Sequence, residues 1–154
     1  MKHDRDMVGA FPVSAMDRLP AGEAMAVRCL RAWSEGPVAM ESLLVPALGP
    51  RGARSCAQAF GEVMGMVQRH GRRALMRYGA NCRCVGSDEA ILAHFVMVAA
   101  TGEREDAMLI ASLLVEGPLL MPLSEAARMA GLYLYQAGLR QGRGFAEPES
   151  ATRH

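Results

Sequence analysis

Two cysteines separated by one arginine, Cys82 and Cys84, are the residues whose type and spacing most plainly suggest chemistry. Thiolates placed one residue apart on a loop can face the same side and share a soft metal ion such as zinc, which needs two further ligands. The candidates for those ligands are His70, His94 and Asp88. A zinc site built from these five residues is therefore one hypothesis.

The same cysteine pair supports two other interpretations. Nearby arginines such as Arg83 favour the reactive thiolate, whereas Asp88 and Glu89 disfavour a further negative charge, so a redox-active dithiol is a second hypothesis. Free cysteine is also among the residue types most often buried, and two small side chains can simply pack at a crowded connection. We favour packing over metal binding and over redox chemistry.

The two histidines near this segment have ordinary explanations. His94 shares a helical stripe with Ile91 and Phe95, where a hydrogen-bonded core histidine is more common than a metal ligand. His70 falls at the end of an expected helix, where a cation complements the helix dipole. Both remain candidate ligands only within the zinc hypothesis.

A run of basic residues lies just before and within the cysteine segment. Guanidinium groups form paired hydrogen bonds to phosphate and carboxylate, so the run is a candidate site for an anion or an acidic partner. Most charge runs are solvated surfaces, and Tyr78 is the only interleaved aromatic, which disfavours nucleic-acid binding. The anion-binding candidates are Arg69, Arg72, Arg73, Arg77 and Arg83.

The motifs that define the common enzyme classes do not occur in the chain. It has no His-Glu-x-x-His, no phosphate-binding G-x-x-x-x-G-K-[ST], no G-x-S-x-G elbow and no pair of C-x-x-C knuckles. We therefore lean towards a protein that is not an enzyme. We expect no cofactor, apart from the zinc of the first hypothesis.

Composition predicts one folded domain in a reducing compartment. The chain has 154 residues, 51% of them hydrophobic, and a net charge of +1, so it can build a core and carries no field that attracts nucleic acid or membrane. No apolar segment follows the charged N-terminus, and no run of 18 apolar residues occurs, so we expect neither a secretory signal nor a membrane span. Four cysteines in such a chain predict reduced thiols and a cytoplasmic location.

The elements that position these residues are expected to be helical. Apolar residues recur at three- and four-residue spacing between Gly-Pro breaks, and no strand-like alternation is evident. We expect an all-α, single-domain bundle of five to six helices over residues 21–140, with an N-terminal arm over 1–20 and a flexible tail over 141–154. The expected helices are 21–34, 37–48 with a bend near Pro46, 51–70, 87–100, 103–116 and 124–139, with a short helical piece at 73–78.

Several packing features follow from the same pattern. Ser87 and Ser124 are expected to cap two of the helices, and the helix from Ser124 to bury Ala127, Ala130, Leu134 and Ala137. The helices at about 87–100 and 103–116 are apolar almost all round, so we expect them to form a buried central hairpin. A row of small residues should let another helix approach closely, and the arm should dock through two apolar side chains. These are Ala57, Gly61 and Gly65 for the row and Phe11 and Val13 for the arm.

Two resemblances to known families can be stated on particular residues. Residues 122–135, PLSEAARMAGLYLY, resemble the first helix and turn of helix-turn-helix regulators, but the residues that follow lack a polar, base-reading face, so one continuous helix is the better prediction. Residues 69–116 resemble uncharacterised small helical proteins of alphaproteobacteria, through Cys82-x-Cys84-x-Gly86-x-Asp88-Glu89 and Glu103-Arg-Glu-Asp-Ala-Met108. That resemblance implies an α-helical fold and no particular activity.

The leading functional hypothesis is a non-enzymatic helical interaction or regulatory protein, self-associating as a homodimer and open to other protein partners. It rests on the buried helices, the small-residue row and the 12 methionines, which suit adaptable contact surfaces. The alternatives are a metal-binding or thiol-redox protein centred on Cys82 and Cys84, and a small nucleic-acid-binding regulator that uses the basic run.

Overall fold

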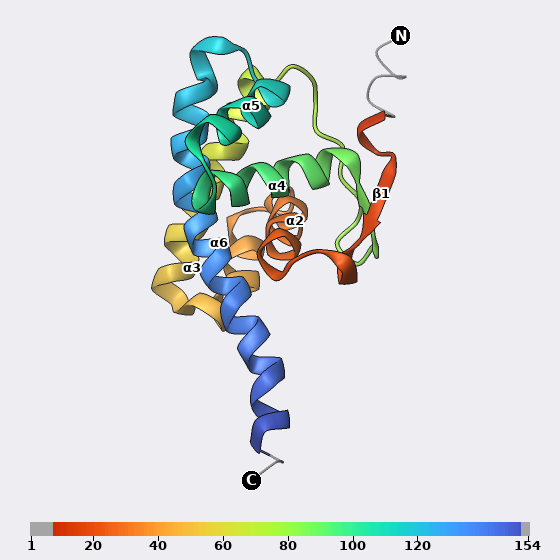
Figure 1. Ribbon diagram of the computed structural model, residues 1–154, viewed down its shortest axis with the longest axis vertical. Coiled ribbons are helices and arrows are strands. Elements are labelled where there is room, and N and C mark those ends of the chain that lie inside the picture. The colour runs from red at the N-terminus through yellow and green to blue at the C-terminus, as the bar shows by residue number, and fades with distance from the viewer. Residues whose placement is uncertain (1–7, 152–154) are drawn as a thin grey trace.

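The protein is described by a computed structural model, which places the backbone of residues 8–151 and the side chains of residues 8–141. Five α-helices and one small two-stranded sheet are arranged around a single core in this part of the chain, so the expected all-α, single-domain bundle is confirmed (Figure 1). In chain order the elements are β1 (Pro12–Ala15), η1 (Met16–Arg18), α2 (Ala21–Trp33), α3 (Pro37–His70), β2 (Cys84–Gly86), α4 (Ser87–Thr101), α5 (Arg104–Leu114), η2 (Gly117–Leu119) and α6 (Leu120–Ala151).

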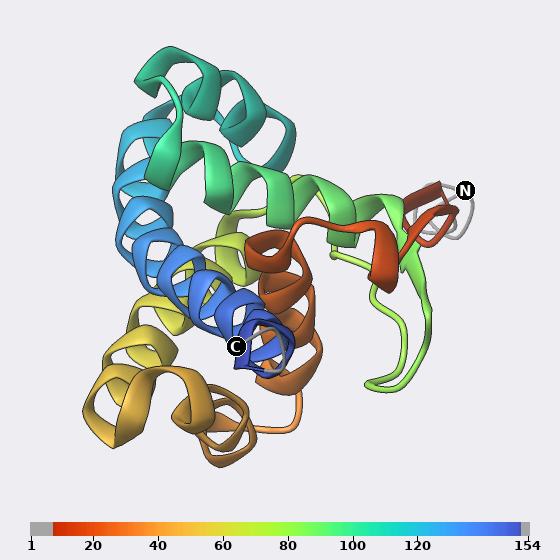
Figure 2. The same ribbon diagram turned by 60° about the horizontal axis from the view of Figure 1, so that its bottom comes forward.

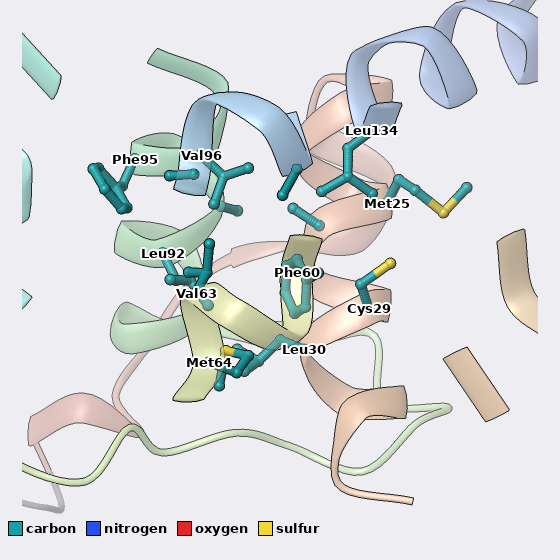
Figure 3. Packing of buried hydrophobic residues seen from close by; sticks show 14 of the residues in the cluster. Met25, Cys29, Leu30, Phe60, Val63, Met64, Leu92, Phe95, Val96 and Leu134 are labelled. Atoms are coloured by element: carbon teal, nitrogen blue, oxygen red, sulfur yellow. The ribbon is translucent and has the colours of Figure 1, made fainter. Parts of the chain in front are cut away.

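The core lies between α2, α3, α4 and α6. Phe60 of α3 and Leu30 of α2 are completely or almost completely buried, with Leu92 of α4 and Leu134 of α6 close by (Figure 3). The four residues of α6 that the spacing predicts to be buried, named above, are all completely buried. None of the described helices combines the length and the apolar content needed to cross a membrane.

Helix α3 is two helical segments joined at a glycine. Gly49 has φ of 74°, the left-handed region that glycine adopts without strain, and it is the position inside α3 with non-helical backbone angles. The expected break at Gly49-Pro50 is thus confirmed. The bend expected near Pro46 is not marked by any non-helical residue, because the change of direction takes place three residues later.

The close helix approaches occur at α6 and not at the small-residue row expected in α3. A Cβ atom added at Gly131 would lie 2.3 Å from the carbonyl oxygen of Val96 in α4, and one at Gly138 would lie 2.7 Å from the backbone nitrogen of Gly22 in α2. Gly61, by contrast, faces open space, and the neighbour of Gly65 is the side chain of Arg69 from its own helix. The prediction for the Gly61–Gly65 row was therefore wrong: spacing identifies small residues but not the face that a neighbour covers.

Helices α4 and α5 pack against each other as expected, but only α4 lies in the centre of the bundle. Helix α4 packs between α2 and α6, whereas α5 lies at one end of the molecule and buries mainly Ala107, Ala111 and Leu114 (Figure 1). Leu109 and Leu113 are 68% and 62% exposed. The apolar character of α5 misled the prediction, because part of that surface is covered by nothing in the described residues.

A small antiparallel sheet joins the N-terminal segment to the cysteine segment. Pro12 pairs with Gly86, Ser14 with Val85 and Ala15 with Cys84, across a bulge at Val13. The sequence predicts no strand here, and that prediction is wrong because strands of three and four residues are too short to show alternation. Residues 12–15 of the expected arm are held by this backbone pairing and not through Phe11 and Val13, which are exposed. Residues 74–79 form no regular secondary structure, so the short helix expected at 73–78 is absent.

Two helix boundaries also differ from expectation. Ser124 lies inside α6, which begins at Leu120 after η2, so it is not a cap. Ser87 is the first residue of α4, and its hydroxyl donates to the carbonyl of Val8 at 2.7 Å. Helix α6 runs through residues 122–135 without a turn, so the prediction of one continuous helix there is confirmed over the helix-turn-helix alternative. The helix continues to Ala151, through most of the expected tail. Residues 152–154 lie outside the described part.

Candidate functional site

The most strongly constrained polar cluster is a buried ion pair that joins α2 to α4. Arg31 is 3% exposed and Glu89 is completely buried. The Nε of Arg31 donates to Oε2 of Glu89 at 2.7 Å, and its terminal amino group donates to Oε1 at 3.0 Å. This is the side-by-side pairing that a planar guanidinium forms with a carboxylate. The hydrogen bond with Glu89 raises the pKa of Arg31, which keeps the guanidinium charged.

The same arginine holds the cysteine segment through its backbone. Its two terminal amino groups donate to the carbonyl oxygens of Cys82 and Cys84, each at 2.7 Å. Residues 82 and 84 lie 51 and 53 positions away along the chain. The Cys82-x-Cys84 spacing thus directs two backbone carbonyl groups at one buried guanidinium group.

The two carboxylates at the start of α4 fix the preceding connection. Glu89 also accepts from the backbone amides of Gly86 at 3.1 Å and Tyr78 at 3.3 Å. Asp88 accepts from the backbone amide of Met76 at 2.8 Å, and both of its oxygens pair with the guanidinium of Arg73. Asp88 is therefore held to the connection before α4, whereas Glu89 joins that connection to Arg31 of α2.

The cysteines of the pair are not buried, which corrects the packing interpretation. Cys82 is half-buried and Cys84 exposed, and both are free thiols. The packing role belongs to Cys29 and Cys56, which lie completely inside the core. Burial raises the pKa of the Cys56 thiol to about 12. Burial, with Cys56 nearby, raises the pKa of Cys29 well above its ordinary value.

The structure does not bring the five candidate zinc ligands together. His94 is exposed and contacts Glu23 at 3.1 Å, so the core role expected for it is wrong. His70 is exposed at the end of α3, and Asp88 is engaged by Arg73. Within residues 8–141, no three or more histidine, cysteine, aspartate and glutamate side chains form a group that could hold a metal ion.

The basic run is divided between several environments. Arg73 pairs with Asp88, and the Nε of Arg72 donates to the carbonyl of Ser112 at 2.8 Å. Arg69 and Arg83 are exposed. Arg72, Arg73 and Arg77 line a cavity of about 630 Å³ next to Trp33, and a neighbouring cavity of about 440 Å³ shares Arg77 with the first. The run is therefore not one continuous surface.

Helix α6 carries a second feature that sequence reasoning missed. Its outer face bears six exposed residues spaced alternately four and three apart, the seam spacing of a coiled coil. We call these six residues the α6 stripe: Met121, Glu125, Arg128, Leu132, Tyr135 and Leu139. The stripe lies opposite the buried face of α6. The heptad spacing is present in the sequence, but the more regular apolar stripe on the buried face of the same helix masks it.

Comparisons of the chain with models of protein families, with curated proteins and with solved structures give no match. The kinship with alphaproteobacterial helical proteins stays a prediction.

Proposed function

We propose that this protein is a non-enzymatic helical interaction protein that forms a homodimer by antiparallel pairing of the α6 stripe with that of a second copy. The observation that carries the proposal is the stripe itself. Four of its six residues are large and apolar, and all four are at least 43% exposed. An apolar seam of this kind on the outside of a helix is a recurrent mode of helix association.

The order of charges along the stripe selects the pairing. A two-fold axis near residues 126–127 places Glu125 of one copy against Arg128 of the other, twice. The same register places Met121 against Leu132, twice, so apolar residues meet apolar residues. An isologous contact requires this kind of self-complementarity. The part of the stripe that is paired in this register runs from Met121 to Leu132, about 17 Å of helix, from 11 steps of about 1.5 Å each.

The charges in the stripe are available for such pairing. Glu125 contacts Arg104 at 3.1 Å and Arg128 at 3.8 Å, and all three side chains are more than half exposed. Exposed ion pairs contribute only about 0–1 kcal/mol, so these contacts can be exchanged at little cost for contacts with a second copy. Dimer formation in this register would also cover the exposed side chains of Met121 and Leu132.

The test is a charge exchange monitored by analytical ultracentrifugation. We expect Glu125→Arg and Arg128→Glu each to weaken the dimer by roughly tenfold, because each creates two like-charge contacts across the two-fold axis. The double variant, which restores opposite charges, should recover the affinity of the unchanged protein. Leu132→Asp should leave monomers.

The matched control is Val38→Asp on α3, since Val38 is also apolar and 78% exposed but lies away from the stripe. It should leave the dimer unchanged. A strictly monomeric unchanged protein at micromolar concentrations, or a double variant no better than either single variant, would refute the proposed dimer.

A thiol-dependent role is the second candidate, and the exposure of Cys84 beside half-buried Cys82 favours it over zinc binding. The Cys82→Ser/Cys84→Ser variant should then lose any effect of oxidant on the oligomeric state. An equal response to oxidant in this variant would exclude the pair. We also propose a cytoplasmic location, where free thiols remain reduced.

A further inference from the structure

The larger cavity lies where the end of α2, the second half of α3 and the connection after α3 meet. Its volume of about 630 Å³ is within the range of pockets that hold small organic ligands. Leu30 and Trp33 of α2 and Met64 of α3 contribute to its apolar lining, and so does Leu75 of the connection. A flexible apolar body would be desolvated against these side chains.

The charged groups that line this cavity are all guanidinium groups. Arg72, Arg73 and Arg77 contribute to it, and none of the aspartates and glutamates that the structure describes does. Arg73 is neutralised by Asp88, and Arg72 uses its Nε on the carbonyl of Ser112. Arg77 makes no hydrogen bond or ion pair with the residues that the structure describes, so its guanidinium can engage an added anion.

The connection after α3, which lines one side of the cavity, is held in place by two hydrogen bonds to side chains of α4. The amide of Met76 donates to Asp88 at 2.8 Å, and that of Tyr78 donates to Glu89 at 3.3 Å. These two contacts flank Arg77 on both sides. The backbone that carries Arg77 is therefore already ordered, so ligand binding would not have to compensate the entropy cost of ordering this segment.

From this combination we propose that the cavity binds a small amphipathic carboxylate, with its apolar body between Trp33 and Leu75 and its headgroup at Arg77 and Arg72. The apolar lining argues against a highly charged ligand, and the arginines argue against a neutral one. Guanidinium groups match a carboxylate with paired, charge-assisted hydrogen bonds. This inference is independent of the proposed α6 dimer, since no residue of the stripe lines the cavity.

Trp33 offers a direct probe, because it is the only tryptophan in the chain. Titration of the full-length protein with decanoate should change the tryptophan fluorescence saturably. Decanol, which has the same chain without the charge, and acetate, which has the charge without the chain, should each bind about tenfold more weakly or worse. Binding of decanol as tight as that of decanoate would overturn the assignment, and so would the lack of a saturable signal.

Substitutions in the cavity test the headgroup contact and the apolar part of the cavity one at a time. Arg77→Gln should weaken decanoate binding roughly fivefold, while Arg83→Gln, an exposed arginine of the same connection that does not line the cavity, should leave it unchanged. Ala74→Phe fills part of the cavity from an exposed position and should also weaken binding. Equal affinities of the Arg77→Gln and Arg83→Gln variants would refute the proposed headgroup contact.

Discussion

Replacing Arg31 with leucine is expected to destabilise the protein by about 3–5 kcal/mol, the usual cost of removing one partner of a buried ion pair. The change removes four hydrogen bonds of 2.7–3.0 Å. It leaves the completely buried carboxylate of Glu89 with two backbone amides as its remaining donors, and it leaves the carbonyls of Cys82 and Cys84 without the guanidinium. An uncompensated buried charge dominates the loss, and the two carbonyls can regain water because the cysteine segment lies near the surface.

The measurement is the free energy of unfolding from urea denaturation, together with hydrogen exchange of the backbone amides in residues 82–86. We expect faster exchange in that segment, because the interaction that fixes it is lost. Arg31→Lys should be intermediate, since an ammonium group retains the charge but cannot span both carboxylate oxygens and both carbonyls. Arg28→Leu, an exposed arginine one turn earlier in α2, is the matched control and should stay within about 0.5 kcal/mol.

A loss below about 1 kcal/mol for Arg31→Leu would refute the reasoning, because no buried pair that anchors a segment should be so dispensable. An Arg31→Lys variant as stable as the unchanged protein would show that charge alone suffices. In that case the paired geometry would not be responsible for the stability.

Two further predictions concern the helix contacts and the buried thiols. Gly131→Ala should lower the free energy of unfolding by about 1–3 kcal/mol, because the added Cβ would lie 2.3 Å from the carbonyl oxygen of Val96. Gly61 faces open space, so Gly61→Ala should raise the free energy of unfolding by up to about 1 kcal/mol. Melting temperatures of the two variants measure this contrast, and equal shifts would contradict it. Burial raises the pKa of the Cys56 thiol to about 12, so the unfolded chain releases the thiol proton at a lower pH than the folded chain. The free energy of unfolding should therefore fall as pH rises from about 9 towards 12, by up to about 1.4 kcal/mol per pH unit for this thiol. In urea denaturation, Cys56→Ala should show a shallower decline with pH, and an identical slope would exclude the effect.

The helices could be predicted because each one is encoded locally. Regular apolar spacing and the breaks at Gly36-Pro37 and Gly49-Pro50 fix α2 and α3 without reference to the rest of the chain. The β1–β2 pair could not be found in this way, because its strands are short and about 70 residues apart. The exposed side of α5 was missed for a related reason, since apolar composition does not tell whether a neighbour is present.

The centre of the polar cluster was also missed, although one signal was present. Arg31 is four residues after Val27 and next to Leu30, so it belongs to the side of α2 that faces the core. A charged residue in that position must have a partner. The partner itself, Glu89, is 58 residues away, and two acids at the start of a helix are too common to be recognised as such a partner from sequence.

Arg31 binds the cysteine segment through the backbone carbonyl groups of Cys82 and Cys84. The course of the backbone there does not depend on these hydrogen bonds being made by any particular side chain at positions 82 and 84. Positions 82 and 84 can therefore accept other side chains while the backbone keeps its course. An engineer could mount a fluorophore, a spin label or a short recognition motif at the exposed position 84 and read out a conformation set elsewhere in the molecule. The segment therefore combines a backbone held by hydrogen bonds with an exposed side chain that can be replaced.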